Sequence, residues 1–169
     1  QIFGRLHDHP KLIDHVKKCV DAGVYDKELL DLYSEEEFVK LETFIDHDRD
    51  YLFTYAGLRQ VVDKYLVQDR STGALYESPQ FMYLLISASI FSKYSPEIRL
   101  DYVKKYYDAI SKHRINIPTP IMAGVRTPLR QYASCVLVDI DDTLDSIFSS
   151  DMAIGKYVAQ RAGIGINAG

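Results

Sequence analysis

Cys135 is the residue whose type and position offer the most direct chemistry. It follows Ser134 at the start of an apolar run, after a segment rich in hydroxyl groups that also carries Arg126 and Arg130. Nearby cations lower the pKa of a thiol and favour the reactive thiolate. A buried, unreactive cysteine would fit the same pattern, and the residues by themselves favour that simpler interpretation.

The same apolar run ends in closely spaced carboxylates. Residues 136–144 form an apolar stretch followed by Asp-x-Asp-x-Thr, with Asp139 and Asp141 as the acidic pair. This pattern resembles the first motif of haloacid-dehalogenase-type phosphatases, which implies Asp139 as phosphoryl-accepting nucleophile and Asp141 as general acid beside magnesium. In that family the motif opens the fold, whereas only 25 residues follow it here. A strand end with an aspartate helix cap is the competing interpretation, and the phosphatase remains a remote alternative.

Histidine and acidic clusters give weaker metal-binding patterns. Residues 46–50 hold three aspartates around His47, but consecutive helical residues fan around the axis, and only His47 and Asp50 share a face. We interpret this cluster as a solvated or salt-bridged helix end, and we predict no metal site. The remaining histidines near one terminus are interpreted as surface residues: His7, His9 and His15.

Composition excludes several classes of protein. With 169 residues, 26% charged and 47% hydrophobic, the chain is neither collagen-like nor disordered. A net charge of -4 argues against a nucleic-acid or membrane-surface partner, and no apolar run approaches the roughly 18 residues of a membrane span. Two cysteines cannot form a disulfide framework, so we expect a reducing, cytoplasmic location. We interpret Cys19 as an unreactive core residue.

Helical periodicity dominates the first two-thirds of the chain, because apolar residues recur three or four positions apart. Ser34 and Glu37 form a capping box. Ser78 and Pro79 open a helix that is apolar nearly all round and should be buried. Helices are predicted over 10–23, 34–45, 48–64, 78–91 and 95–112, and a short β-hairpin over 65–76.

The pattern changes from residue 115 onward. Prolines at 118 and 120 predict extended backbone over 117–120. A buried strand is predicted over 135–138, then a helix capped by Asp142 that runs to about Arg161, then a strand over 163–166. Strand, helix and strand in this order indicate the start of an α/β unit, so we place a domain boundary near residue 114.

Several longer blocks resemble one family. Residues 118–128, 131–135 and 160–169 resemble the large, catalytic subunit of class I ribonucleotide reductase. Residues 46–50 and 65–68 resemble its helical N-terminal domain. The resemblance covers essentially the whole chain in the right order, and several ungapped blocks of this length are far more specific than one short motif.

The resemblance implies both a fold and a reaction. The expected fold is α+β, with 1–114 as the mainly helical N-terminal domain and 115–169 as the first strand-helix-strand of an incomplete α/β barrel. The family reduces ribonucleoside diphosphates to deoxyribonucleotides. A radical in a small partner subunit generates a thiyl radical in the large subunit, which removes the ribose 3′-hydrogen. Two further cysteines supply the reducing equivalents and close to a disulfide.

The matching blocks assign roles to individual residues. The resemblance implies that Cys135 is one cysteine of the redox pair, with its partner outside this chain. Thr119 and Ser134 match positions that hydrogen-bond substrate, and Ala162 and Gly163 lie in a block close to it. A separate segment matches the site that binds a deoxynucleoside triphosphate effector at the dimer interface: Asp142, Thr143 and Leu144.

The resemblance also implies partners and missing parts. The expected partners are a second copy of the large subunit, the small radical-generating subunit with its metal cofactor, thioredoxin or glutaredoxin, and nucleotides, including ATP and deoxynucleoside triphosphate effectors. No cofactor is expected on this chain. The radical cysteine, the second redox cysteine and the ATP-binding cone are absent from these residues, so we expect a fragment that is inactive without a C-terminal segment. The alternative is a non-catalytic interaction or dimerisation fragment of a split reductase.

Overall fold

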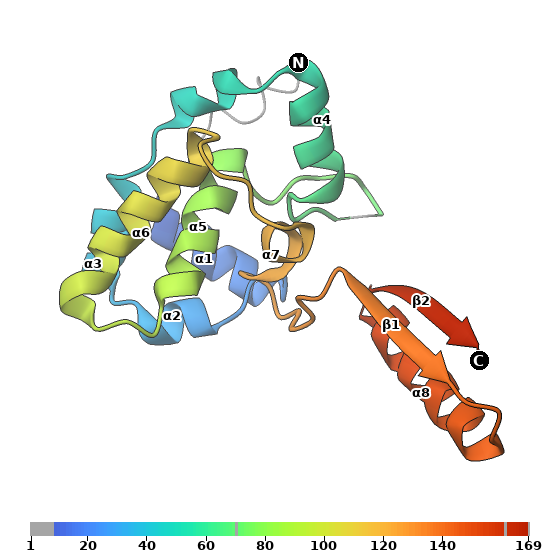
Figure 1. Cartoon of the computed structure of the whole chain (residues 1–169). Coiled ribbons are helices and arrows are strands. Elements are labelled where there is room, and N and C mark those ends of the chain that lie inside the picture. The colour runs from blue at the N-terminus through green and yellow to red at the C-terminus, as the bar shows by residue number, and fades with distance from the viewer. Residues whose placement is uncertain (1–8, 70, 161, 169) are drawn as a thin grey trace.

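A computed structural model describes residues 9–69, 71–160 and 162–168, and it shows a helical region from which a smaller β-α-β unit extends (Figure 1). His7 and Arg161 lie outside the described residues. The helical region contains α1 Leu12–Asp21, α2 Glu28–Leu32, α3 Glu35–Glu42, the 3-10 helix η2 His47–Leu52, α4 Tyr55–Lys64, α5 Pro79–Phe91, α6 Pro96–Ser111 and α7 Thr119–Gly124. The smaller unit contains β1 Cys135–Ile140, α8 Leu144–Ala159 and β2 Gly163–Ala168. The predicted α+β fold class is confirmed.

Helix α5 forms the centre of the helical region. It is buried from Pro79 to Ala88, as its uniform apolar character predicts, and α6 and α7 pack against it (Figure 1). Ser78 caps it by accepting a hydrogen bond from the backbone N–H of Phe81 at 3.3 Å. The core around α5 is closed by apolar side chains from the other helices, including Leu12, Val16, Phe38, Leu41, Leu58, Val61, Val103 and Ile110.

The start of α3 follows the sequence closely. The Ser34 hydroxyl accepts from the Glu37 N–H at 3.2 Å, and the Glu37 carboxylate accepts from the Ser34 N–H at 2.9 Å. Both bonds satisfy N–H groups that a helix start leaves without backbone partners. The predicted capping box is therefore confirmed.

The predicted helix over 48–64 is wrong in one respect, because it forms two elements. Thr54 accepts from the Gly57 N–H at 3.2 Å and starts α4, while η2 ends at Leu52. A threonine that caps a new helix takes a non-helical backbone conformation, which breaks the chain direction. Leu52 and Tyr55, on either side of this break, are exposed.

Two groups predicted at the surface are buried. His15 and Asp50 are each only 6% exposed, so the surface interpretation is wrong for both. Asp50 faces α5, where Gln80 donates to its carboxylate at 2.8 Å. The salt-bridged character predicted for this cluster is present at Asp46, whose carboxylate lies 3.1 Å from Arg49 Nε.

The two arms of the hairpin predicted over 65–76 pair in the expected antiparallel direction, but over a short length. Among the described residues its single bridge joins Gln68 and Leu75, and the Tyr76 N–H donates to the Val67 carbonyl at 2.9 Å. Gly73 has a φ of 71°, a conformation that glycine adopts without steric cost. The hairpin is thus a turn with one bridge rather than two regular strands.

The prediction of extended backbone over 117–120 is wrong after Pro118. Pro118 is extended, but Thr119 already begins α7. Pro120 falls in the first helical turn, where the N–H that proline lacks has no partner in any case. Thr119 is therefore held on a helix rather than on an extended loop.

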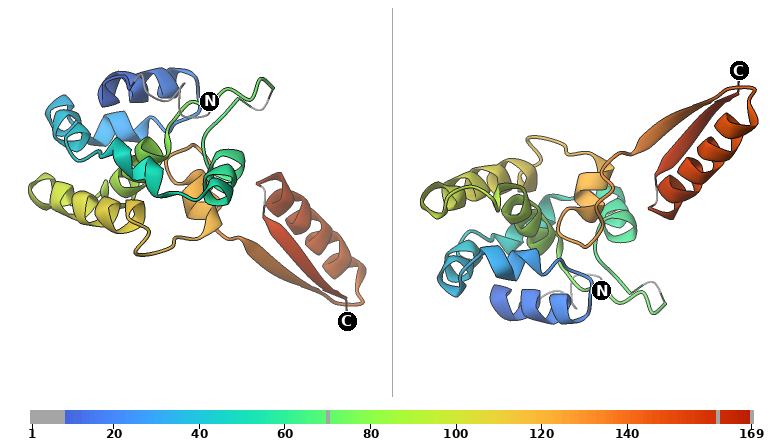
Figure 2. Two further views of the ribbon diagram at one scale, coloured as in Figure 1. Left: turned by 90° about the horizontal axis from the view of Figure 1, so that it is seen from above. Right: turned by 90° about the horizontal axis from the view of Figure 1, so that it is seen from below.

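The β1-α8-β2 unit has the predicted order and a parallel sheet. Cys135 pairs with Gly163 and Ile140 with Ala168, and α8 covers one face of the two strands (Figures 1 and 2). The predicted burial of β1 is wrong, since Cys135 is exposed and Leu137 is 85% exposed. Only alternate residues of β1 face α8, and among the described residues no element covers the opposite face.

The start of α8 also differs from the prediction. Thr143, not Asp142, is the N-cap, and its hydroxyl accepts from the Ser146 N–H at 3.2 Å.

In the described part of the chain, no helix is both long and apolar enough to cross a lipid bilayer.

Candidate active site

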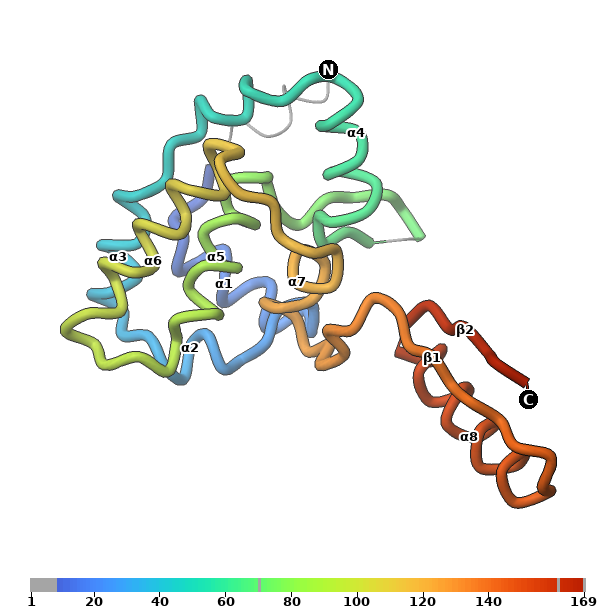
Figure 3. The backbone as a smooth tube through the Cα atoms, in the orientation of Figure 1, coloured from blue at the N-terminus to red at the C-terminus, as the bar shows by residue number. Residues whose placement is uncertain are grey.

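The paired strands bring four of the predicted site residues together. The Ser134 carbonyl accepts from the Gly163 N–H at 3.0 Å, and Cys135 lies opposite Gly163 in the sheet register. Ala162 is buried beside them, and its N–H donates to the Tyr157 carbonyl at 3.1 Å. Both strands begin next to the helical region, as the tube in Figure 3 shows. These residues thus form one cluster at the amino ends of β1 and β2.

Gly163 keeps this cluster open. A Cβ atom on Gly163 would lie 3.2 Å from the Ser134 carbonyl oxygen and 3.9 Å from Cys135 Sγ. The first distance is tighter than an ordinary contact, so a larger residue would press on the start of β1. The free thiol of Cys135 is exposed here. By contrast Cys19 is buried, and burial raises the pKa of its thiol to about 12, which confirms it as inert core.

Thr119 lies across a cleft from this cluster. The cleft has a volume of about 640 Å³, and both Thr119 and Ser134 line it, together with Lys64 from the end of α4. Lys64 is the one charged side chain among its described lining residues, which otherwise offer hydroxyl and amide groups, including Gln131 and Gln160. A cleft with one cation, several donors and no carboxylate among those residues suits an anionic ligand.

A buried ion pair fixes the segment that carries Thr119. Arg126 donates from Nε to a Glu77 carboxylate oxygen at 2.8 Å, and both side chains are fully buried. The same guanidinium donates to the Met122 carbonyl at 2.7 Å and to the Tyr65 carbonyl at 3.0 Å. Buried charges persist in a core only when they are paired and hydrogen-bonded, as here. The pair ties Arg126, just after α7, to Glu77, just before the start of α5.

The cations expected to act on Cys135 have other partners. Arg126 is paired with Glu77, and Arg130 pairs with Asp26 on the surface. The sequence reasoning missed Glu77 because it lies 49 residues from Arg126 along the chain. No local pattern in the sequence connects the two residues.

The predicted effector segment lies at the opposite end of β1. Asp142, Thr143 and Leu144 are exposed at the tip farthest from the helical region (Figure 1). Six strand residues at about 3.3 Å each place this tip roughly 20 Å from Cys135. The structure therefore separates the predicted residues into two groups, one at each end of the β1-α8-β2 unit.

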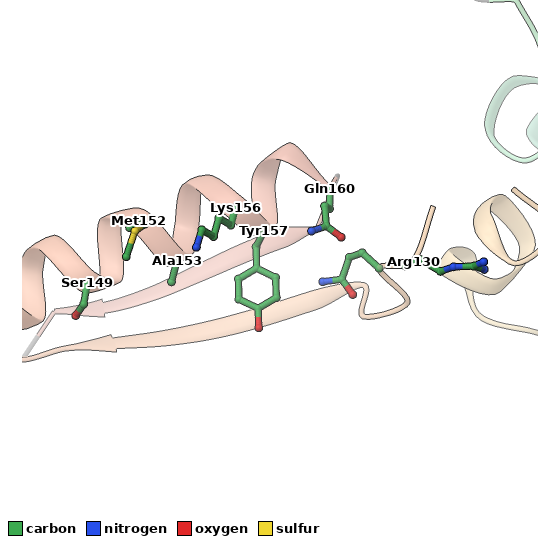
Figure 4. Close-up of a pocket in the computed structure, with 8 residues that line it drawn as sticks. Arg130, Ser149, Met152, Ala153, Lys156, Tyr157 and Gln160 are labelled. Atoms are coloured by element: carbon green, nitrogen blue, oxygen red, sulfur yellow. The ribbon is translucent and has the colours of Figure 1, made fainter. Parts of the chain in front are cut away.

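One side of α8 forms a shallow surface cavity of about 430 Å³. Figure 4 shows Ser149, Met152, Ala153 and Tyr157 along the helix, while Arg130 points away from it. Other apolar side chains of α8 are also uncovered, among them Phe148, which is 68% exposed. This exposed side of α8 lies between the two groups of predicted residues.

The acidic pair makes contacts that differ from those of a metal centre. Asn167 donates from Nδ2 to Asp139 at 3.1 Å, and the backbone N–H of Asp141 donates to the Ser146 hydroxyl at 2.9 Å. Within the described residues, no three histidine, cysteine or acidic side chains are grouped so that they could hold a metal ion.

Comparisons with known proteins find relatives of one kind. A family model described as the all-alpha domain of ribonucleotide reductase matches residues 51–130. A ribonucleoside-diphosphate reductase alpha subunit of Haemophilus influenzae is 62% identical over 96% of the chain. The alpha subunit of ribonucleoside-diphosphate reductase 1 of Escherichia coli is 59% identical over 95% of the chain. Over nearly its whole length, the chain is similar to ribonucleotide reductase large subunits. A phage T4 alpha subunit is 46% identical over 99% of the chain.

The matched relatives are much longer than this chain. It spans about a fifth of their length, 21% for the two bacterial subunits and 22% for the phage subunit. All three relatives are named as reductase subunits, which supports the reductase interpretation over the interaction fragment and the phosphatase.

Proposed function

We propose that this chain is part of a ribonucleoside-diphosphate reductase large subunit and contributes one redox cysteine to the active site. The observation that carries the proposal is the cluster of Ser134, Cys135 and Gly163 beside a cleft lined by Thr119. An exposed thiol next to hydroxyl donors suits a site where a polar substrate must be bound and reduced.

The cleft supports a nucleoside diphosphate as substrate. In the proposal, the hydroxyls of Thr119 and Ser134 donate hydrogen bonds to substrate oxygens, and Ala162 and Gly163 leave room for the sugar. Lys64 provides a positive charge that attracts the diphosphate. Because a small residue at 163 is needed beside Ser134, the same glycine serves both the sheet and the access to Cys135.

The proposed reaction exchanges a carbon–oxygen bond for a disulfide. A thiyl radical outside this chain removes the ribose 3′-hydrogen, the 2′-hydroxyl leaves as water, and the thiol formed by the abstraction returns its hydrogen to C3′ at the end, which regenerates the thiyl radical. Cys135 and a second cysteine outside this chain give up two hydrogen equivalents and form a disulfide. A protein dithiol such as thioredoxin or glutaredoxin then reduces that disulfide by exchange, which needs an accessible thiolate. The exposure of Cys135 supports this role.

The proposal extends to regulation and assembly. Asp142, Thr143 and Leu144 would bind a deoxynucleoside triphosphate effector at a dimer interface that includes α8. The exposed apolar side of α8 supports such an interface. The complete enzyme would also need the C-terminal segment of the subunit and a small radical-generating subunit, which carries the metal cofactor. No cofactor is proposed for this chain itself.

We also propose a two-domain organisation, with 1–114 as the helical N-terminal domain and 115–169 as the start of the catalytic α/β barrel. α7 and Arg126 belong to the second segment and pack onto the first through Glu77. In this proposal the buried ion pair lies at the contact between the two domains.

Replacement of the proposed redox cysteine tests the function. In the full-length subunit, assayed with its radical-generating partner and thioredoxin, Cys135→Ser should abolish multiple turnover because no disulfide can form and be reduced. Folding and nucleotide binding should stay nearly unchanged, since Cys135 is exposed. The matched control is Cys19→Ala, which should keep turnover. Sustained deoxycytidine diphosphate production by Cys135→Ser would overturn the assignment.

A further inference from the structure

Tyr65 connects the end of α4 to the substrate cleft. Its hydroxyl oxygen lies 3.3 Å from Oγ1 of Thr119, and both residues line the cleft. Nothing in the local sequence pairs these residues, which are 54 positions apart.

The backbone of Tyr65 is held from two directions. Its N–H donates to the Val61 carbonyl at 2.9 Å, which completes the last turn of α4. Its carbonyl accepts from the Arg126 guanidinium at 3.0 Å, and that guanidinium is locked by Glu77 in the core. These two bonds fix the backbone from which the Tyr65 side chain reaches Thr119.

One direction of this hydrogen bond would give the contact a role in substrate binding. Gln60 donates from Nε2 to the Tyr65 hydroxyl oxygen at 3.5 Å. Either hydroxyl could be the donor in the contact between Tyr65 and Thr119. In the arrangement that concerns us, the phenol oxygen accepts from Gln60 and the phenol proton is donated to Thr119 Oγ1, which leaves the threonine O–H free to donate into the cleft.

We propose that Tyr65 is a positioning residue that orients the Thr119 hydroxyl as a hydrogen-bond donor toward an oxygen of the bound nucleoside diphosphate. This inference rests on the proposed function and goes beyond it, since it explains how a single hydroxyl on α7 is given one orientation. Lys64, the neighbour of Tyr65, supplies the only charge among the described lining residues of this cleft, and it favours the same anionic ligand.

A double-mutant cycle tests the role of Tyr65. Binding of cytidine diphosphate is measured by equilibrium dialysis with the full-length subunit as wild type, Tyr65→Phe, Thr119→Ala and the double variant. Tyr65→Phe should raise the Kd and the KM about threefold to tenfold, as expected for loss of one neutral hydrogen bond, and leave kcat nearly unchanged. In the Thr119→Ala background the same substitution should have no further effect, because its target hydroxyl is gone.

Two controls separate positioning from a structural role. Tyr55→Phe, at the first residue of α4, a tyrosine that is 76% exposed, should leave the Kd unchanged. Thermal unfolding should show that Tyr65→Phe, which keeps the aromatic ring, retains its melting temperature.

Each result of the cycle is decisive. If Thr119→Ala weakens binding and Tyr65→Phe does not, or if the two effects add, the positioning role is overturned while the proposed function stands. If Thr119→Ala itself has no effect on binding, the proposed substrate contact fails, and the inference fails with it.

Discussion

His15 illustrates how a single titratable side chain is built into the core. It lies between Cys19 and Tyr25, with its Nε2 3.2 Å from the Tyr25 hydroxyl. Tyr25 in turn donates to Glu77, the partner of Arg126. Burial lowers the pKa of His15 to about 4, so the imidazole is neutral at physiological pH.

This burial predicts a defined pH dependence of stability. The unfolded chain binds a proton at His15 near pH 6.5, whereas the folded chain binds it only near pH 4. The free energy of unfolding is therefore unaffected by this proton above pH 6.5, and it decreases as the pH falls from 6.5 toward 4. The shift corresponds to about 3 kcal/mol. Urea unfolding of His15→Gln at pH 7 and pH 4.5 should show a loss on acidification about 2 to 3 kcal/mol smaller than in wild type.

Asp50 provides a control of opposite sign. Burial raises the pKa of its carboxyl to about 6, so the folded state holds a proton that the unfolded chain releases near pH 4. Asp50→Asn should therefore remove a stability loss that occurs between pH 4 and pH 6 as the pH rises.

Unfolding free energies of His15→Gln that fall with acidification as steeply as those of wild type would contradict the assignment for His15.

At the scale of elements, helix capping and the proposed effector binding at the start of α8 depend on different residues. Thr143 caps the helix, while the adjacent Asp142 makes no cap bond to it. Thr143→Ala should therefore destabilise α8 by about 1 kcal/mol. Asp142→Ala should leave α8 intact and weaken binding of the deoxynucleoside triphosphate effector.

Calorimetric titration of effector and thermal unfolding of the full-length subunit distinguish these two effects. Asp145→Ala, which changes a neighbouring acidic residue in the first turn of the same helix, is the matched control and should leave effector affinity unchanged. Unchanged effector affinity and dimerisation in Asp142→Ala would show that the effector site is misplaced.

Elements governed by local interactions were predictable from the sequence. The capping box of Ser34 and Glu37 and the buried helix after Ser78 depend on residues three or four positions apart. The split of 48–64 was not predictable in this way, because Thr54 was not recognised as a cap within an otherwise continuous apolar pattern. α7 does not follow from the proline pattern, because proline disfavours a helix at the preceding residue but also fits the first helical turn, where Pro120 lies.

For the candidate site, the sequence predicts some of the residues but not the contacts that hold them. The roles predicted for Cys135, Ser134 and Gly163 came from blocks of family resemblance, and the structure brings these residues together. The contacts of Tyr65 with Thr119 and of Glu77 with Arg126 join positions 54 and 49 residues apart. Periodicity and spacing cannot predict such pairs, because they depend on how α4, α5 and α7 pack.

At the scale of the whole molecule, the two parts differ in how their apolar surface is covered. The helical region surrounds α5, whereas β1 and β2 expose Leu137 and Ile166. Open strand edges and uncovered apolar faces favour association with other chains. We therefore expect the 169 residues expressed alone to be poorly soluble or oligomeric, and to become stable with the C-terminal segment.

The central claim is that these residues form one part of a ribonucleoside-diphosphate reductase. The most direct test is conversion of labelled cytidine diphosphate, measured with and without the complementing C-terminal segment, in the presence of the radical-generating subunit and a dithiol reductant. We predict deoxycytidine diphosphate only when the C-terminal segment is present, because in our proposal this chain contributes one redox cysteine, Cys135, while the thiyl radical forms outside it. Deoxycytidine diphosphate from the 169 residues and the radical subunit alone, or none from the reconstituted mixture, would contradict the account.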